Sequence, residues 1–190
     1  INLEGPCYLR LGGNDNPVVY KDSQKPRFGE ISCLQPDGNV AIIANGEMLI
    51  LAKKAMELLK NEGIICRLYS IHTLKPIDHL TIEKIARECS CIVTLIEHSI
   101  INGIGTAIAE ILFSCGYQGK FQKFGIPDEY AKELGDKEWL RDYYGLGHER
   151  IALEIKRHQA QADSVEQSQW GKPDKVQGSG EVINPAPIII

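Results

Sequence analysis

The sequence predicts an α/β fold with a mainly parallel open sheet covered by helices on both faces, in three α/β/α layers. Three largely apolar runs, at 40–44, 64–71 and 91–96, are typical of strands that are buried on both faces. Each run is followed by a stretch whose apolar residues recur at helical spacing. Strands and helices that alternate over short connections indicate a parallel sheet.

The first strand–helix unit begins at the strand 40–44. Asn45 and Gly46 turn the chain, and a helix is expected over 47–62. Gly63 then stands where a glycine commonly ends a helix.

The second unit begins at the strand 64–71. Pro76 blocks its continuation, and Asp78 is placed to cap a helix over 79–88. Asp78 is therefore expected at the start of that helix.

The third strand, 91–96, is followed by a helix that Gly116 ends. A fourth strand is expected over 120–124, and short helices over 137–144 and 149–157. These elements complete the predicted sheet and its helical cover.

Composition shifts along the chain predict four parts. Residues 1–13 include a short strand-like segment and are assigned to the end of a preceding domain. Residues 14–38 contain three prolines without sustained periodicity and are expected to be a linker. The compact domain is placed at 39–158. Residues 159–190, rich in Gln, Ser, Gly and Pro, are expected to be disordered or a non-native extension.

Bulk composition excludes several classes of function. The chain has 190 residues, of which 43% are hydrophobic, and a net charge of −4. Without a basic run, nothing favours binding to nucleic acid or to an anionic membrane. No apolar run reaches the roughly 20 residues of a membrane-spanning helix. The six cysteines fall mostly in apolar patterns, which favours reduced thiols and a cytoplasmic protein.

The candidate site is the loop after the third strand, with the sequence EHSIINGIG. Ligand sites of open α/β sheets gather where strands end at their carboxyl edge. His98 suits acid–base chemistry or a phosphate hydrogen bond, or else it shapes the turn through a backbone hydrogen bond. Glu97 pairs with His98 or with a partner chain, or it is a solvated carboxylate, which is the favoured interpretation.

Gly103 and Gly105 precede the third helix. They suit an anion-cradling turn, because a helix N-terminus offers free N–H groups. Close packing of helix on strand is the favoured alternative, since position 108, where a third glycine would complete the motif, is Ile108. His, Cys and acidic residues show no metal-ligand spacing.

Two further residues are candidates for contacts at the domain boundary. Asp128 follows Pro127 and suits a helix cap or a contact with a neighbouring subunit. Arg10 follows the opening segment and suits either a substrate anion or an ion pair with the preceding domain.

Six stretches resemble the C-terminal part of transketolases, in particular the separately encoded C-terminal sections of bacteria. They run in order from about residue 5 to residue 157: GPCYLRLGG, NVAIIANGEML, LKPID, VTLIEHSIINGIGTAIAE, GIPDEY and LRDYYGL. Residues 1–13 then resemble the last strand of the pyrimidine-binding domain. With Ile1 in place of methionine, the chain is expected to be a fragment or a processed piece.

The resemblance implies an enzyme that uses thiamine diphosphate and Mg²⁺ in carbohydrate metabolism. Both would bind between a pyrophosphate-binding and a pyrimidine-binding domain at a dimer interface, mainly outside this chain. The reaction would transfer a two-carbon ketol unit from a ketose to an aldose. This domain would support packing and dimerisation, in a homodimer or a heterotetramer, without catalytic or cofactor-binding residues of its own and without activity when isolated.

We predict substrate contacts at Arg10, which matches the first arginine that the family often has in this region, and at His98, from its chemistry and its place after the third strand. Loop or interface contacts are predicted at Glu97, His98, Gly103, Gly105 and Asp128. Gly13 stands where the family often has a second arginine, so a phosphorylated and a non-phosphorylated sugar both remain open. Three alternatives also remain: a deoxyxylulose-phosphate synthase, the β subunit of a 2-oxo-acid dehydrogenase, and a non-catalytic interaction module.

Overall fold

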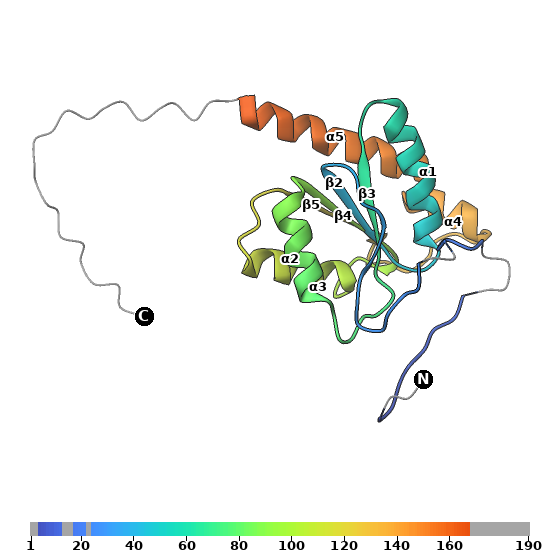
Figure 1. Cartoon of the computed structure of the whole chain (residues 1–190). Coiled ribbons are helices and arrows are strands. Elements are labelled where there is room, and N and C mark those ends of the chain that lie inside the picture. Colours follow the sequence, from blue (N-terminus) through green and yellow to red (C-terminus); the bar gives the residue numbers. More distant parts are fainter. Residues whose placement is uncertain (1–3, 13–16, 22–23, 168–190) are drawn as a thin grey trace, which may run out of the picture.

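The computed structural model describes residues 4–12, 17–21 and 24–167 (Figure 1). Its strands are β1 (Ser32–Gln35), β2 (Val40–Ala44), β3 (Cys66–Ser70), β4 (Cys91–Ser99) and β5 (Lys120–Ile126). Its helices are α1 (Met48–Asn61), α2 (His79–Glu88), α3 (Ile104–Ser114), α4 (Lys137–Tyr143) and α5 (His148–Gln167). The alternation of strand and helix from β2 onward is confirmed.

The strands form one sheet in the order β1-β3-β2-β4-β5. β1 pairs with β3 antiparallel, and the other neighbours pair parallel. β2 lies at the centre, with Val40 opposite both Cys66 of β3 and Cys91 of β4. The mainly parallel open sheet is therefore confirmed, with one antiparallel edge strand.

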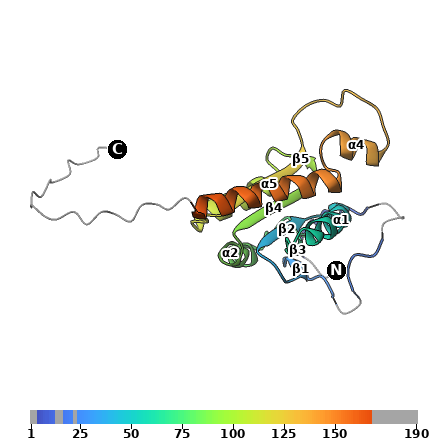
Figure 2. The ribbon, with the colours of Figure 1, turned by 90° about the horizontal axis from the view of Figure 1, so that it is seen from above.

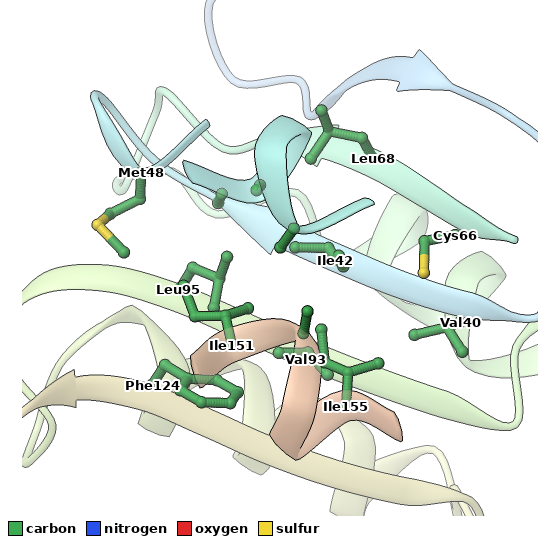
Figure 3. Close-up of a cluster of buried hydrophobic side chains, with 14 of the residues drawn as sticks. Val40, Ile42, Met48, Cys66, Leu68, Val93, Leu95, Phe124, Ile151 and Ile155 are labelled. Atoms are coloured by element: carbon green, nitrogen blue, oxygen red, sulfur yellow. The ribbon is translucent and has the colours of Figure 1, made fainter. Parts of the chain in front are cut away.

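Helices cover both faces of the sheet. One hydrophobic cluster joins alternate β2 and β4 residues to α1 and α5, and Figure 3 shows Ile42, Val93 and Leu95 packed near Ile151 and Ile155. The second cluster joins the intervening strand residues to α2 and α3. Figure 1 shows α1 and α5 on one side of the sheet and α2 and α3 on the other, and Figure 2 shows α5 and α1 lying over one face of the strands. This arrangement confirms the three-layer prediction.

Local signals place two of the helices where the sequence predicts. Asp78 caps α2, where its Oδ1 accepts the Thr81 N–H at 3.1 Å, while Oδ2 accepts the Ile31 N–H at 2.9 Å. Gly63 follows α1 with φ of +80°, the left-handed conformation that glycine adopts without steric cost. Within the described residues, no helix is long and apolar enough to cross a bilayer.

The stretch 14–38 differs from the predicted linker at its C-terminal end. It contains β1, whose alternating half-buried pattern spans only four residues and gives too short a periodic signal to recognise. The pairing of β1 with β3 is non-local, so sequence patterns near β1 do not reveal it. The sheet thus begins ahead of residue 39.

Element ends also differ from the predictions. β4 continues through Glu97, His98 and Ser99, with an irregularity in its pairing before Ser99 meets Ile126. α5 continues to Gln167, past the predicted end of the domain at residue 158. None of the described residues 4–12 lies in a strand, and the remainder of the predicted tail, 168–190, lies outside the described residues.

Candidate functional site

The carboxyl edge of the sheet carries a cluster of charged side chains. The connections that follow β2 and β4 run in opposite directions along the sheet. α1 leads from β2 to its neighbour β3, whereas α3 leads from β4 to its neighbour β5. A divergence of this kind opens the crevice in which open α/β folds usually bind ligands. The residues next to this crevice are Glu47, at the start of α1, and Glu97, near the end of β4.

Arg141 of α4 fills the crevice between these two carboxylates. Its Nε donates to Glu97 Oε1 and its Nη2 donates to Glu47 Oε2, both at 2.7 Å. Lys137 Nζ lies 2.6 Å from the same Glu47 oxygen. The Arg141 side chain is only 11% exposed, so these charge-assisted hydrogen bonds are partly shielded from water.

This cluster has a structural role. The hydrogen bond with Glu97 raises the pKa of Arg141, burial opposes the rise, and the bond with Glu47 adds to it. Arg141 therefore stays charged and joins the ends of β2 and β4 through α4. Glu97 is not the solvated carboxylate that the sequence favours, and the role of Arg141 is one that sequence reasoning missed.

A pocket of about 430 Å³ lies beside the cluster, under α4 and the loop that precedes it. Its apolar walls come from Ile126, Leu140, Tyr144 and Leu146. Charged groups at its border are already paired: Glu129 Oε2 lies 2.7 Å from Lys132 Nζ. The pocket is a hydrophobic space with a charged rim.

Gly103 and Gly105 allow α3 to pack closely on β4. A Cβ at Gly105 would lie 2.9 Å from Thr94 Oγ1 and 2.8 Å from Lys123 Cδ. A Cβ at Gly103 would lie 3.0 Å from Ile96 Cδ1. The close-packing interpretation is thus supported.

Lys123 of β5 holds the EHSIINGIG loop in place. Its Nζ donates to the Ile100 carbonyl oxygen and to Thr106 Oγ1, both at 3.2 Å. A lysine within a strand pattern gives no signal for this role, because both acceptors lie in a different part of the sequence.

The other predicted residues are not brought together. The imidazole of His98 is exposed and forms no hydrogen bond with the described residues. Arg10 is exposed in the segment 4–12 and has no ion pair there. Asp128 is exposed and caps no described helix; α4 is capped instead by Asp136, whose Oδ1 accepts the Trp139 N–H at 2.8 Å.

Thiols and acids do not form a metal centre. In the described residues, no group of three or more His, Cys, Asp or Glu side chains is placed to hold a metal ion. All six cysteines are free. Burial raises the pKa of Cys66 to about 12 and that of Cys91 to about 11, so these thiols are inert core residues.

The domain with this carboxyl edge matches a known family over residues 29–151: the transketolase C-terminal domain. The chain belongs to this family. The matched region begins ahead of β1, in agreement with the sheet that the structure shows.

Relatives of this transketolase C-terminal domain include parts of larger proteins. The chain is 36% identical over 154 residues to a Methanocaldococcus jannaschii protein named as a transketolase C-terminal section, covering 80% of this chain and 48% of that protein. It is 34% identical over 165 residues to 1-deoxy-D-xylulose-5-phosphate synthase of Heliobacterium modesticaldum, covering 86% of this chain and 25% of that protein. The chain therefore spans half or less of the length of these relatives.

A solved structure supports the same assignment. A split-gene transketolase, described as an inactive beta4 tetramer, superposes with a TM-score of 0.67 at 30% identity. The superposition covers 77% of this chain and 46% of that one. The α/β fold is thus that of a transketolase C-terminal domain.

Proposed function

We propose that this chain is the C-terminal part of a thiamine-diphosphate-dependent, transketolase-like enzyme. The enzyme transfers a two-carbon ketol unit from a ketose to an aldose. The family match over residues 29–151 carries this proposal. The presence of relatives named as separate transketolase sections supports it.

Thiamine diphosphate would be held elsewhere in the complete enzyme. Its diphosphate requires a divalent cation and open N–H donors, and the described residues do not fit that requirement. The crevice between β2 and β4 is filled by Arg141, and the described residues contain no group of three or more side chains placed to hold a divalent cation. We therefore derive no catalytic step through the cofactor on this chain, and assign the domain to packing and assembly.

The partner would be the remainder of the enzyme, with pyrophosphate-binding and pyrimidine-binding domains in the same or a separate chain. We assign residues 1–13 to the end of the pyrimidine-binding domain. The split-gene relative is described as an inactive beta4 tetramer. By analogy, this chain would be inactive alone and active in a homodimer or heterotetramer of complete composition, in the cytoplasm.

Contacts with substrate would come, if at all, from Arg10 and His98. Both side chains are exposed and without intrachain partners in the described residues, so both are available to a sugar or its phosphate. Substitution of Arg10 by Gln should raise KM for a phosphorylated substrate in the complete enzyme while leaving kcat less affected. An unchanged KM would remove Arg10 from the substrate site.

The test of the function is reconstitution. The chain is assayed for thiamine-dependent two-carbon transfer alone, and then together with or fused to the product of the adjacent upstream reading frame. We expect no turnover alone and turnover in the complete enzyme. Turnover by the chain alone would overturn the proposal.

A second candidate is supported by the relative from Heliobacterium modesticaldum, which is named as a 1-deoxy-D-xylulose-5-phosphate synthase. The two candidates differ in the product. A synthase of that kind forms a 1-deoxy ketose, whereas a transketolase forms a ketose that keeps its 1-hydroxyl group. Mass spectrometry of the product therefore separates them.

A further inference from the structure

The polypeptide upstream of β1 reaches the sheet at its carboxyl edge. The Tyr20 hydroxyl donates to Ser70 Oγ, at the end of β3, at 2.6 Å. The Gly29 N–H donates to Thr73 Oγ1, just beyond β3, at 3.1 Å. Figures 1 and 2 place the described N-terminal residues and α4 at the same end of the sheet. The described residues Tyr20 and Gly29 therefore contact the domain at this edge.

A strap of exposed residues, 127–139, crosses the same edge after β5. Every residue of the strap is exposed, and α4, which begins within it, contributes no buried residue. The strap is nevertheless fastened at its C-terminal end, through Lys137 to Glu47 and through Arg141 to Glu47 and Glu97. It is a fixed surface without a core of its own.

Two large apolar side chains of the strap bury almost nothing within the chain. Tyr130 is 95% exposed and Leu134 is 98% exposed. Trp139 and Tyr143 of α4 stack on each other with ring centroids 5.2 Å apart, and both remain more than 40% exposed. Aromatic and apolar side chains gathered on an ordered, exposed segment are typical of an interface.

We propose that the strap is the surface on which the upstream half of the same enzyme docks, with Tyr130 and Leu134 as its apolar anchors. This inference rests on the proposed function, because it needs that upstream half. The relatives indicate the size of this partner, because the chain covers 48% of the Methanocaldococcus jannaschii protein. The contact of Tyr20 with Ser70 indicates that the upstream half lies at the carboxyl edge of the sheet, which the strap also crosses.

The structure also supplies a matched control. Phe113, 87% exposed, lies at the C-terminal end of α3. Because α3 runs back from the carboxyl edge, Phe113 is at the opposite edge of the sheet. Its truncation removes an exposed aromatic side chain at a site away from the strap.

The experiment uses hydrogen–deuterium exchange of the strap amides in the 190-residue chain and in the complete enzyme. We expect strong protection of 127–139 only in the complete enzyme. The double variant Tyr130→Ala/Leu134→Ala should leave the melting temperature of the chain nearly unchanged, because both side chains are exposed. In the complete enzyme it should speed exchange of the strap at least about ten-fold, as when two interface anchors are truncated. Phe113→Ala should change neither quantity.

Three results would overturn the inference. The strap could exchange at the same rate in the chain and in an active complete enzyme. Phe113→Ala could reduce protection as much as the double variant does. Protection could also arise in the chain alone, rise with its concentration and vanish in the double variant, which would assign the strap to a second copy. If two-carbon transfer is absent from every assembly, the proposed function itself fails, whereas transfer with an unprotected strap refutes only the docking surface.

Discussion

Replacement of Arg141 by Met is the sharpest test of the cluster at the carboxyl edge. The variant keeps most of the side-chain volume and removes the charge from between Glu47 and Glu97. Both hydrogen bonds of Arg141, each 2.7 Å long, are lost. The two carboxylates are then left beside each other, with Lys137 remaining near Glu47.

The magnitude follows from the burial of the partners. A hydrogen bond to a charged group contributes roughly 1.5–3 kcal/mol, and about 1 kcal/mol or less where water reaches the charged group. Glu97 is about one-third exposed and can be rehydrated, so its bond is assigned about 1 kcal/mol. Glu47 is more buried, and its bond is assigned about 2 kcal/mol. The loss of about 3 kcal/mol corresponds to a drop in melting temperature of roughly 6–12 °C for a chain of this size.

The assay is urea unfolding followed by circular dichroism, with Arg150→Met as the control. Arg150 pairs with Glu154 on the surface of α5, at 2.8 Å, and its side chain is 56% exposed. Exposed pairs contribute about 0–1 kcal/mol, so the control should lose little stability. In a double-mutant cycle, Arg141→Met and Glu97→Gln should show coupling of about 1 kcal/mol. A loss for Arg141→Met no larger than that of the control would refute the structural role of the cluster.

Three other substitutions test separate features. Gly38→Ala should cost more than about 3 kcal/mol or prevent folding, because φ is +119° and the added Cβ would lie 2.2 Å from the Ile65 carbonyl oxygen; thermal melting measures it. Thr94→Val should be neutral or stabilising by up to about 1 kcal/mol, because Thr94 Oγ1 is buried without a hydrogen-bond partner; urea unfolding measures it. Burial alone would raise the pKa of Asp78, but hydrogen bonds lower it below its ordinary value of 3.8. The ionised Asp78 side chain therefore stabilises the fold at pH values above 3.8, and this stabilisation is lost as the pH falls through the lower folded-state pKa. The difference in unfolding free energy between the wild type and Asp78→Asn should therefore narrow as the pH falls through that range.

Controls accompany these variants. Gly46→Ala has a positive φ of +53° but nothing within 4 Å of the added Cβ, so it should cost about 1 kcal/mol and less than Gly38→Ala. Equal losses would show that the backbone contact at Gly38 is not the cause. A Thr94→Val variant destabilised by more than about 1 kcal/mol would indicate a hydrogen bond to Thr94 that water supplies.

The strands and helices of the core could be predicted because their signals are local. The run from Val40 to Ala44 is wholly buried and apolar. Asp78 caps α2, which begins at the next residue in the sequence, His79. Each such feature is decided within a few residues. β1 could not be predicted, because its four residues gain their strand conformation by pairing with β3, far along the chain.

The candidate site shows the same limit. The pattern of Gly103 and Gly105 favours close packing, because Ile108 stands where a third glycine would complete an anion-binding motif; Gly103 lies at the N-cap of α3 and Gly105 lies within its first turn. The role of Arg141 depends on Glu47 and Glu97, which belong to distant segments and meet only after the sheet has formed. The spacing of these residues in the sequence does not indicate that they are in contact, so the cluster could be found only in the three-dimensional structure.

The central position of β2 has a consequence for how the sheet is assembled. β2 is the first parallel strand in the chain; β3 then adds on one side, and β4 and β5 add in turn on the other. Each strand joins an edge that already exists, so no strand has to be inserted between two others. β1 is the exception, because it is made first and must wait for β3. Growth outward from a middle strand keeps the early contacts close in sequence, which favours rapid formation of the β2–α1–β3 unit. The arginine of α4 follows all five strands in the chain, so its hydrogen bonds to Glu47 and Glu97 add to a pairing of β2 and β4 that the sheet already provides.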